Sequence, residues 1–275
     1  MSSDLTVMAC QLSVPATPTE KARERHVSRC VALIDAELNK TGADLVVLPE
    51  LSTIEYSRES FECLAELAEN ADGPTFRQFR ELAKKHNTTV VYGIPRIEKN
   101  GYRISQVVVA PTGELIGYYD KLHRAQFGAS MENEYFSAGD RAFLFSVNGV
   151  KIAPVICYDI RFPELTRQLS VHHGAMLILH CGAYARDASF ASWHAFAKTR
   201  AMENQVYLLS LNRAGQEFGH SIFCGPWIDE SIPAVEFDEY NECFQHLTID
   251  LERLHQVRKE YPFLKDRRSC YSNLL

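Results

Sequence analysis

Two observations predict an α/β fold for this chain of 275 residues. Short apolar runs rich in β-branched residues alternate with longer amphipathic segments, which is the pattern of strands that alternate with helices. In addition, Asn-Gly turns at Asn100-Gly101 and Asn148-Gly149 separate pairs of apolar runs and favour hairpins, so that some pairing is antiparallel. Periodicity alone does not distinguish a doubly wound sheet from other layered α/β arrangements.

The first half of the chain begins with a β–α unit. A strand over residues 5–12 is followed by a helix over 20–39. The run DLVVLPE, residues 44–50, predicts a second buried strand, which stops at the carboxylate of Glu50. The elements expected next are a helix over 73–86 and strands over 88–97, 104–110 and 115–121. The last of these strands also ends on a charge, that of Lys121.

In the second half, an apolar run over residues 150–156 ends abruptly at Cys157, and Pro163 then begins an amphipathic helix. A thiol at such a corner is either a nucleophile stabilised by free helix N–H groups or a small buried hydrophobe. The other expected elements are strands over 143–147, 175–180, 206–211, 222–228 and 246–250 and a helix over 190–204. The polar segment 253–275 is expected to pack on the body or on a neighbouring subunit.

Composition limits the class of partner. With 46% hydrophobic residues the chain can bury a substantial core, and no linker or repeat divides it, so one domain over 1–275 is expected. A formal net charge of -6 without basic clusters argues against nucleic acid or an anionic membrane as partner. Without a long apolar run or a signal-peptide pattern, a cytoplasmic location is expected. The eight cysteines are scattered singly and suggest neither disulfides nor a zinc site.

Three apolar strands therefore end in Glu50, Lys121 and Cys157. Taken singly, each residue has a simpler structural interpretation: Glu50 is a solvated loop acid, Lys121 a surface charge and Cys157 a core residue. Adjacent strands running in one direction would bring all three side chains to one edge of the sheets. A thiol, a carboxylate and an ammonium then suffice for acyl transfer from an amide, as nucleophile, proton shuttle and cation for the oxyanion.

The same segments resemble the nitrilase superfamily of carbon–nitrogen hydrolases. The glutamate motif of the family is similar to LPEL around Glu50, its lysine motif to YYDKLH around Lys121, and its cysteine motif to VICYDIRFPEL around Cys157. Further matching segments are GDRAF, RAMENQ, LNRAG and the terminal DRRSCY. The resemblance implies a four-layer α–β–β–α sandwich, assembled as a homodimer or a larger homo-oligomer.

The resemblance also implies roles. Cys157 would be the nucleophile, Glu50 the general base and then acid, and Lys121 the cation for the oxyanion, helped by the backbone N–H of Tyr158. The family has a second glutamate between the lysine and the cysteine. In ENEYFSAGD the pattern favours Glu132, but Ala138 replaces the usual proline, and Glu134 stays an alternative.

Tyr158-Asp159 stands where true nitrilases have Trp-Glu, and Arg161-Phe162 resembles the omega-amidase and related amidase branches. This predicts hydrolysis of a small linear amide, such as an omega-amide of a carboxylic acid, through a thioester and without metal or other cofactor. Arg161 and Tyr184 are candidate substrate-binding residues, although for Arg161 the sequence favours a structural ion pair over substrate binding. The alternatives are an N-carbamoyl amidohydrolase, a nitrilase and a non-catalytic binding member of the fold. A redox protein is disfavoured by the lack of a CxxC motif.

Overall fold

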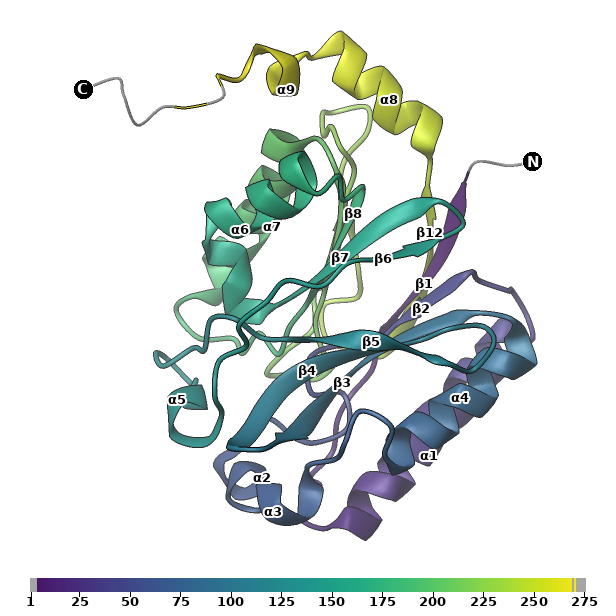
Figure 1. Cartoon of the computed structure of the whole chain (residues 1–275), viewed down its shortest axis with the longest axis vertical. Helices are drawn as coiled ribbons and strands as arrows, with labels where there is room; N and C mark the ends of the chain where they lie inside the picture. The colour runs from purple at the N-terminus through teal and green to yellow at the C-terminus, as the bar shows by residue number, and fades with distance from the viewer. Residues whose placement is uncertain (1–3, 269, 271–275) are drawn as a thin grey trace.

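Two six-stranded sheets packed face to face form the body of the protein in this computed structural model, which describes residues 4–268 and 270 (Figure 1). The strands of the first sheet are β1 (Leu5–Gln11), β2 (Leu45–Val47), β3 (Thr89–Glu98), β4 (Gly101–Val109), β5 (Leu115–Asp120) and β12 (Cys243–Ile249). Those of the second sheet are β6 (Phe145–Val147), β7 (Val150–Ile156), β8 (Leu177–Cys181), β9 (Tyr207–Leu211), β10 (Ile222–Cys224) and β11 (Val235–Glu236). The strand orders are β12-β1-β2-β3-β4-β5 and β11-β10-β9-β8-β7-β6.

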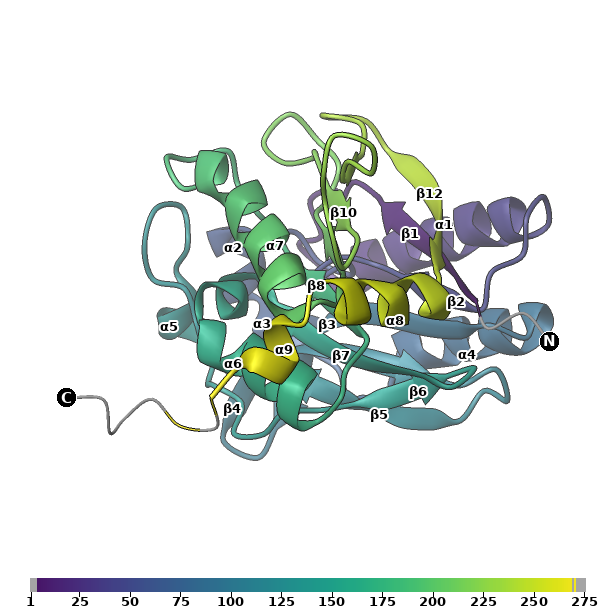
Figure 2. The ribbon, with the colours of Figure 1, turned by 90° about the horizontal axis from the view of Figure 1, so that it is seen from above.

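Nine α-helices lie in the described part of the chain, and some of them cover the outer faces of the two sheets. They are α1 (Glu20–Leu38), α2 (Arg58–Glu62), α3 (Leu64–Leu67), α4 (Pro74–His86), α5 (Glu132–Tyr135), α6 (Pro163–Arg167), α7 (Phe190–Asn204), α8 (Leu251–Glu260) and α9 (Phe263–Asp266). The long helices α1 and α4 lie on the first sheet, and α6 and α7 lie on the second (Figures 1 and 2). This confirms the expected α–β–β–α sandwich. None of the helices in the described part of the chain is long and apolar enough to cross a membrane.

The period-two alternation of the strands explains the layers. In β1, Val7 and Ala9 face the second sheet and join the core between the sheets, whereas Met8 and Cys10 face α1 and α4. Both faces of each central strand are buried, so these strands read as continuous apolar runs rather than alternating ones. At roughly 25 cal/mol per Å² of apolar surface, burial on both faces makes the sandwich the main source of stability.

Several predicted element boundaries differ from the structure. The strand expected over 222–228 ends at Cys224, and the last strand begins earlier than expected, at Cys243. The helix α6 begins at Pro163 as expected, and a 3₁₀ turn that was not expected, Cys157–Arg161, joins it to β7. In each case tertiary pairing and turn geometry, which local propensity does not report, set the boundary.

The segment expected to be a polar tail begins with the helix α8. Asp250 caps its N-terminus by accepting a hydrogen bond from the N–H of Arg253, and Leu254 and Val257 are fully buried. Beyond it, the ring of Tyr261 stacks on Trp227 at a centroid distance of 3.7 Å. The part of this segment up to Tyr261 therefore packs on the body of the same chain. Two residues of the terminal DRRSCY motif, Ser269 and Tyr271, lie outside the described residues.

Candidate active site

Glu50 and Lys121 follow strands of the first sheet, and Cys157 follows a strand of the second. Because β2 pairs parallel with β3 and two antiparallel pairings lead from β3 to β5, the chain leaves β2 and β5 at the same edge. The expectation that the three strands are adjacent is wrong, since β3 and β4 lie between β2 and β5 and β7 belongs to the other sheet. The packing of one sheet on the other brings Cys157 to the two charged residues.

Lys121 forms two buried ion pairs at this edge. Its Nζ lies 2.8 Å from Oε1 of Glu50 and 2.7 Å from Oε1 of Glu132, and all three side chains are at most 1% exposed. Removing charges from water is costly, so such a cluster persists only when its hydrogen bonds are satisfied. Here the second oxygen of each carboxylate accepts a backbone N–H, that of Ala183 for Glu50 and that of Ala125 for Glu132.

The two competing glutamates lie in different environments. Glu132 begins the short helix α5, is fully buried, and also accepts a hydrogen bond of 2.8 Å from the hydroxyl of Tyr56. Glu134 lies one half-turn further, is exposed, and pairs with Arg58 at 2.9 Å. The structure therefore places Glu132, and not Glu134, beside Lys121.

Burial and charge act in opposite directions on these groups. Burial alone would lower the pKa of the Lys121 ammonium, but the carboxylates of Glu132 and Glu50 outweigh it and raise that pKa well above its usual range. Burial raises the pKa of the Glu50 carboxyl, opposed by the ammonium of Lys121. Lys121 is thus held as a cation, and Glu50 is a more basic carboxylate than one in water.

Cys157 sits in a strained turn directly after β7. Its backbone φ is 45°, in the left-handed region that costs a residue with a Cβ of order 1–3 kcal/mol. The carboxylate of Asp159 stabilises the turn by accepting the N–H of Ile156 at 3.0 Å and the hydroxyl of Tyr119 at 2.7 Å. It also accepts the N–H of His123 at 3.0 Å. Since Tyr119 and His123 flank Lys121, Asp159 connects the thiol-bearing turn to the lysine-bearing segment.

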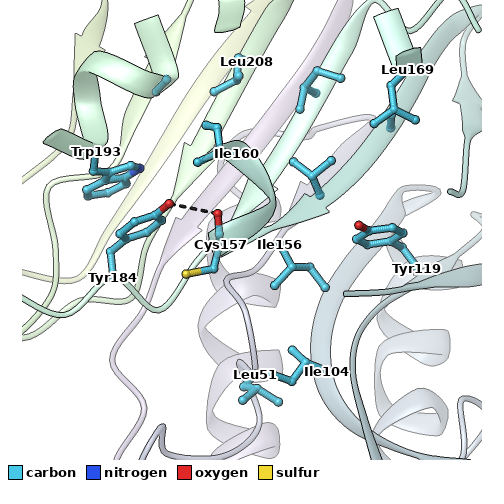
Figure 3. Packing of buried hydrophobic residues seen from close by; sticks show 14 of the residues in the cluster. Leu51, Ile104, Tyr119, Ile156, Cys157, Ile160, Leu169, Tyr184, Trp193 and Leu208 are labelled. Atoms are coloured by element: carbon cyan, nitrogen blue, oxygen red, sulfur yellow. Dashed lines mark hydrogen bonds between the residues drawn. The ribbon is translucent and has the colours of Figure 1, made fainter. Parts of the chain in front are cut away.

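The carbonyl oxygen of Cys157 is held by two side chains. The hydroxyl of Tyr184 donates to it at 3.0 Å (Figure 3). Nε2 of His180 lies 2.9 Å from the same oxygen. Tyr184 is itself fixed by stacking on Trp193, with ring centroids 4.7 Å apart and planes 7° from parallel. The other ring nitrogen of His180 accepts from Ser210 at 2.6 Å. These contacts hold the strained peptide that places the thiol.

The thiol is almost completely buried. Burial raises the pKa of Cys157 well above its usual range, the carboxylate of Glu50 raises it further, and the ammonium of Lys121 lowers it. The N–H of Ala183, which donates to Glu50, also stabilises a negative charge on the sulfur. Cys157 is therefore held as a thiol, which would need a nearby base to act as a nucleophile.

Sequence reasoning missed the residues that hold the Glu50 loop. One guanidinium nitrogen of the fully buried Arg213 donates to the carbonyls of Glu50, Leu51 and Ile54 at 2.8–3.1 Å. The loop also crosses Gly93 of β3 so closely that an added Cβ would lie 2.4 Å from the N of Leu51. Arg213 belongs to the LNRAG motif, which marked this segment in the sequence. The carbonyls that Arg213 binds lie more than 150 residues away, so the sequence did not reveal the contact.

Asn212, in the same motif, holds the opposite wall. Its side-chain oxygen accepts the N–H of Tyr184 at 2.8 Å, and its side-chain nitrogen donates to the carbonyl of Tyr184 at 3.0 Å. These two hydrogen bonds fix the backbone next to Ala183, whose N–H donates to Glu50. Asn212 and Arg213 therefore position the two loops that contact Glu50.

A pocket of about 390 Å³, counting the part open to solvent, borders Cys157. The residues that line it come from the loops at this end of both sheets: Tyr56, Ala125, Phe127, Ala129, Ser130, Cys157, Tyr158, Arg161, Ala183, Tyr184, Ala185, Asp187 and Ser189. Both candidate substrate-binding residues, Arg161 and Tyr184, are among them. The apolar walls with a few polar groups suit a small organic ligand.

Arg161 does not form the structural ion pair that was its alternative role. Its guanidinium lies 5.5 Å from the ring centroid of Phe127 and 5.0 Å from that of Phe196, and no salt bridge links it to a described acidic residue. Asp187 lines the same pocket, and its carboxylate is used by Ser189 and the N–H of Ala129. Arg161 is thus a cation on the pocket wall held by aromatic contacts.

Carbon–nitrogen hydrolases supply a family model that matches residues 6–259. The chain belongs to the carbon-nitrogen hydrolase family. The omega-amidase NIT2 of Bos taurus is 29% identical to it over 259 residues, which cover 90% of this chain and 91% of that protein. The nitrilase homolog 2 of Dictyostelium discoideum is 30% identical, with 90% and 76% covered. Saccharomyces cerevisiae Nit3, a member of branch 10 of the nitrilase superfamily, superposes with a TM-score of 0.83 at 27% identity and covers 96% of this chain and 97% of its own.

These matches confirm the predicted nitrilase-type sandwich and establish a carbon–nitrogen hydrolase. Within the described part of this hydrolase, one group of three His, Cys, Asp or Glu side chains is close enough to share a metal ion, namely His194, His220 and Glu236. None of the three lines the pocket beside Cys157.

Proposed function

We propose that the protein hydrolyses a small linear amide, R–CO–NH₂, to the acid and ammonia through a thioester on Cys157. The observation that carries the proposal is the meeting of a thiol, a buried carboxylate and a buried ammonium beside one pocket, with the Ala183 N–H serving both Cys157 and Glu50. This set supplies the nucleophile, the proton acceptor and the positive charge that attack on an amide requires.

In the first half-reaction Glu50 accepts the thiol proton as the sulfur attacks the amide carbon. The C=O electron pair moves to oxygen, and the oxyanion is stabilised by the Lys121 ammonium and the N–H of Tyr158. This N–H belongs to the first residues of the 3₁₀ turn, whose amides have no acceptor within the turn. The C–N bond then breaks, Glu50 returns the proton to nitrogen, and ammonia leaves.

In the second half-reaction Glu50 takes a proton from water, which attacks the thioester carbon. Collapse of this tetrahedral intermediate breaks the C–S bond, releases the acid, and returns the proton to sulfur. The raised pKa of Glu50 suits a group that must alternately accept and donate a proton. Glu132 acts as a positioning residue, since it holds the Lys121 ammonium through its 2.7 Å ion pair.

An omega-amide, whose far end is a carboxylate, is the substrate class that we favour. Arg161 places a guanidinium on the pocket wall without a salt-bridge partner among the described residues, and guanidinium groups bind carboxylates in a bidentate manner. The relatives named omega-amidase support the same choice. Tyr184 would contact the substrate next to the reacting carbonyl, because its hydroxyl already bonds the backbone of Cys157.

Ammonia release across omega-amides, neutral amides of equal length, N-carbamoyl amines and nitriles tests the substrate class. Arg161→Met should raise KM for an omega-amide at least tenfold and leave the neutral amide of equal length almost unchanged. An equal loss on both substrates would contradict the role of Arg161. Turnover of nitriles or N-carbamoyl amines, but of no amide, would contradict the amidase proposal.

Mass spectrometry of the enzyme quenched during turnover tests the intermediate. The acyl group is expected on Cys157, and Cys157→Ala should lose activity at least a thousandfold. Cys181→Ala is the matched control, because Cys181 is a buried cysteine inside β8 that does not line the pocket. An acyl group on another cysteine, or an active Cys157→Ala enzyme, would refute the thioester. EDTA should leave the rate unchanged, since no proposed step uses a metal ion.

A further inference from the structure

His194, His220 and Glu236 converge on the outer side of the second sheet from three separate segments. His194 lies on α7, His220 in the loop before β10, and Glu236 on β11. One potential ligand atom of each lies within 4.8 Å of the others. Their side chains are 17%, 30% and 43% exposed, so the group is open to ions from solution.

The hydrogen bonds of His194 direct one lone pair into this group. Its Nε2 lies 2.7 Å from the carbonyl oxygen of His220, and only an N–H can bond to a carbonyl. In the neutral ring, Nδ1 is then an unprotonated nitrogen, and it lies 3.8 Å from Oε1 of Glu236. A ligating histidine usually has its other ring nitrogen fixed in this way by a carbonyl or a carboxylate.

The spacing fits a small divalent ion. Zn²⁺ binds imidazole nitrogen and carboxylate oxygen at about 2.0–2.2 Å, so ligand atoms in a tetrahedral site are roughly 3.3 Å apart. Here Nε2 of His220 lies 2.9 Å from Oε2 of Glu236, and the His194–Glu236 separation is 3.8 Å. Both distances are close to the required value but end on different oxygens of Glu236, so its carboxylate would bind the ion with both oxygens; Glu236 lies on the short edge strand β11.

Backbone strain at His220 accompanies the cluster. Its φ is 58°, in the left-handed region, and its N–H donates to the carbonyl of Asp238 at 3.1 Å. Residues other than glycine in such strained backbone conformations tend to occur at functional sites. The strained loop places the carbonyl of His220 on His194 and its imidazole on Glu236, so one residue supports both other members.

We propose that His194, His220 and Glu236 bind one Zn²⁺ ion, with water in the remaining coordination position, and that the ion ties α7 to β10 and β11. Two imidazoles and one carboxylate form a ligand set that zinc uses in proteins. The site is separate from the proposed reaction. It stabilises α7, which also carries Trp193, the residue stacked on Tyr184 at the pocket.

Lys198 is the natural competitor for this position. It follows His194 by one helical turn on α7, and its Nζ lies 3.4 Å from Oε1 of Glu236. An ammonium so close to the carboxylate repels a divalent cation and occupies the oxygen that would bind it. Metal binding at this site must therefore displace Lys198, which makes removal of its charge a sensitive test.

The experiment is calorimetric titration of the EDTA-treated, dialysed full chain with ZnCl₂, together with thermal unfolding. One Zn²⁺ per chain should bind and raise the unfolding temperature, whereas MgCl₂ at the same concentration should not. Glu236→Gln and His194→Gln should each weaken Zn²⁺ binding at least tenfold. Lys198→Met should strengthen it, which a merely structural role of the cluster would not produce.

His246→Gln is the matched control. His246 and Glu37 form a similar exposed pair, 3.5 Å apart, that no third ligand joins among the described residues, so its loss should leave Zn²⁺ binding unchanged. The titration is repeated in Cys157→Ala to remove binding to the pocket thiol. Unchanged affinity in Glu236→Gln and His194→Gln, or weaker binding in Lys198→Met, would overturn the proposal.

Discussion

The two sheets contribute to the candidate active site in physically different ways. The first sheet supplies Glu50 and Lys121, whose positions are set by side-chain ion pairs within a buried cluster. The second supplies Cys157, whose position is set by the backbone, in a turn with φ of 45° held by Asp159. Side chains held by charge lose their geometry when a charge is removed. A side chain held by a strained turn loses it when the hydrogen bonds of the turn are removed.

The half of the site on the first sheet and the half on the second sheet share one structural feature, a buried histidine bonded to a loop carbonyl. In the first, Nε2 of His26 lies 2.9 Å from the carbonyl of Ser52, in the loop that follows Glu50. In the second, Nε2 of His180 lies 2.9 Å from the carbonyl of Cys157. Burial lowers the pKa of both imidazoles to about 4. Each half therefore depends on a neutral buried histidine that holds the loop of a candidate catalytic residue.

The largest expected effects come from the charged half. Glu50→Gln removes the proton acceptor and Lys121→Met removes the cation, and each should lower kcat by roughly a hundredfold or more. Lys121→Met should also destabilise the fold by about 3–5 kcal/mol, because it leaves two buried carboxylates without their partner. Steady-state kinetics and urea unfolding measure the two effects. A variant with normal kcat and only a raised KM would show that the residue serves binding alone.

A smaller loss is expected from the backbone-held half. Asp159→Asn replaces one acceptor oxygen by an NH₂ group that cannot accept hydrogen bonds, so the turn loses some of the contacts to Ile156, Tyr119 and His123. We expect kcat to fall about ten- to a hundredfold, with roughly 1–3 kcal/mol of lost stability.

Glu69→Gln separates the two consequences of Asp159→Asn. Glu69 is also a buried carboxylate, bonded to Arg23 and Thr75 away from the pocket. The Glu69→Gln variant should lose about as much stability as Asp159→Asn, while its kcat stays that of the wild type. Equal kcat values for Asp159→Asn and the wild type would show that the strained turn does not need this carboxylate.

A fall in pH should lower the stability of the fold in both halves of the site. The pKa of His26 and of His180 is about 4 when folded and about 6.5 when unfolded, so between these values the unfolded chain binds more protons. Stability is therefore fully present above pH 6.5 and is lost as the pH falls toward 4. Each histidine should account for about 2 kcal/mol of loss between pH 8 and pH 5.

Urea unfolding at several pH values measures this slope. His26→Gln keeps a side-chain donor for Ser52 and removes the titration, so its stability should depend less on pH below 6.5 than that of the wild type. A parallel slope in the variant would exclude His26 as a source of the acid lability.

The smallest expected effect is that of Tyr184→Phe. The change removes one of the two donors to the carbonyl of Cys157 but keeps the stacking on Trp193. Since His180 still bonds this carbonyl, kcat should fall only severalfold and the thermal stability should change little. A loss as large as that of Asp159→Asn would mean that Tyr184 contributes to the reaction beyond holding the turn.

Local sequence alone determined most of the strands, the main helices and the positions of Glu50, Lys121 and Cys157 after strands. The period of apolar residues and the chemistry of turns act over a few residues, so they can be read without the fold. The resemblance to carbon–nitrogen hydrolases added the sandwich, and the two packed sheets and the superposition on Saccharomyces cerevisiae Nit3 confirm it.

Only the tertiary structure decided which glutamate lies beside Lys121, which side chains hold the Glu50 loop, and that Cys157 comes from the opposite sheet. Arg213 meets the carbonyl of Glu50 across 163 positions of sequence, and His194 meets Glu236 from another element. The separate cysteines and histidines showed no metal-binding spacing, yet three potential ligands converge in the fold. Contacts between distant segments depend on how the two sheets pack, and a local pattern does not contain that information.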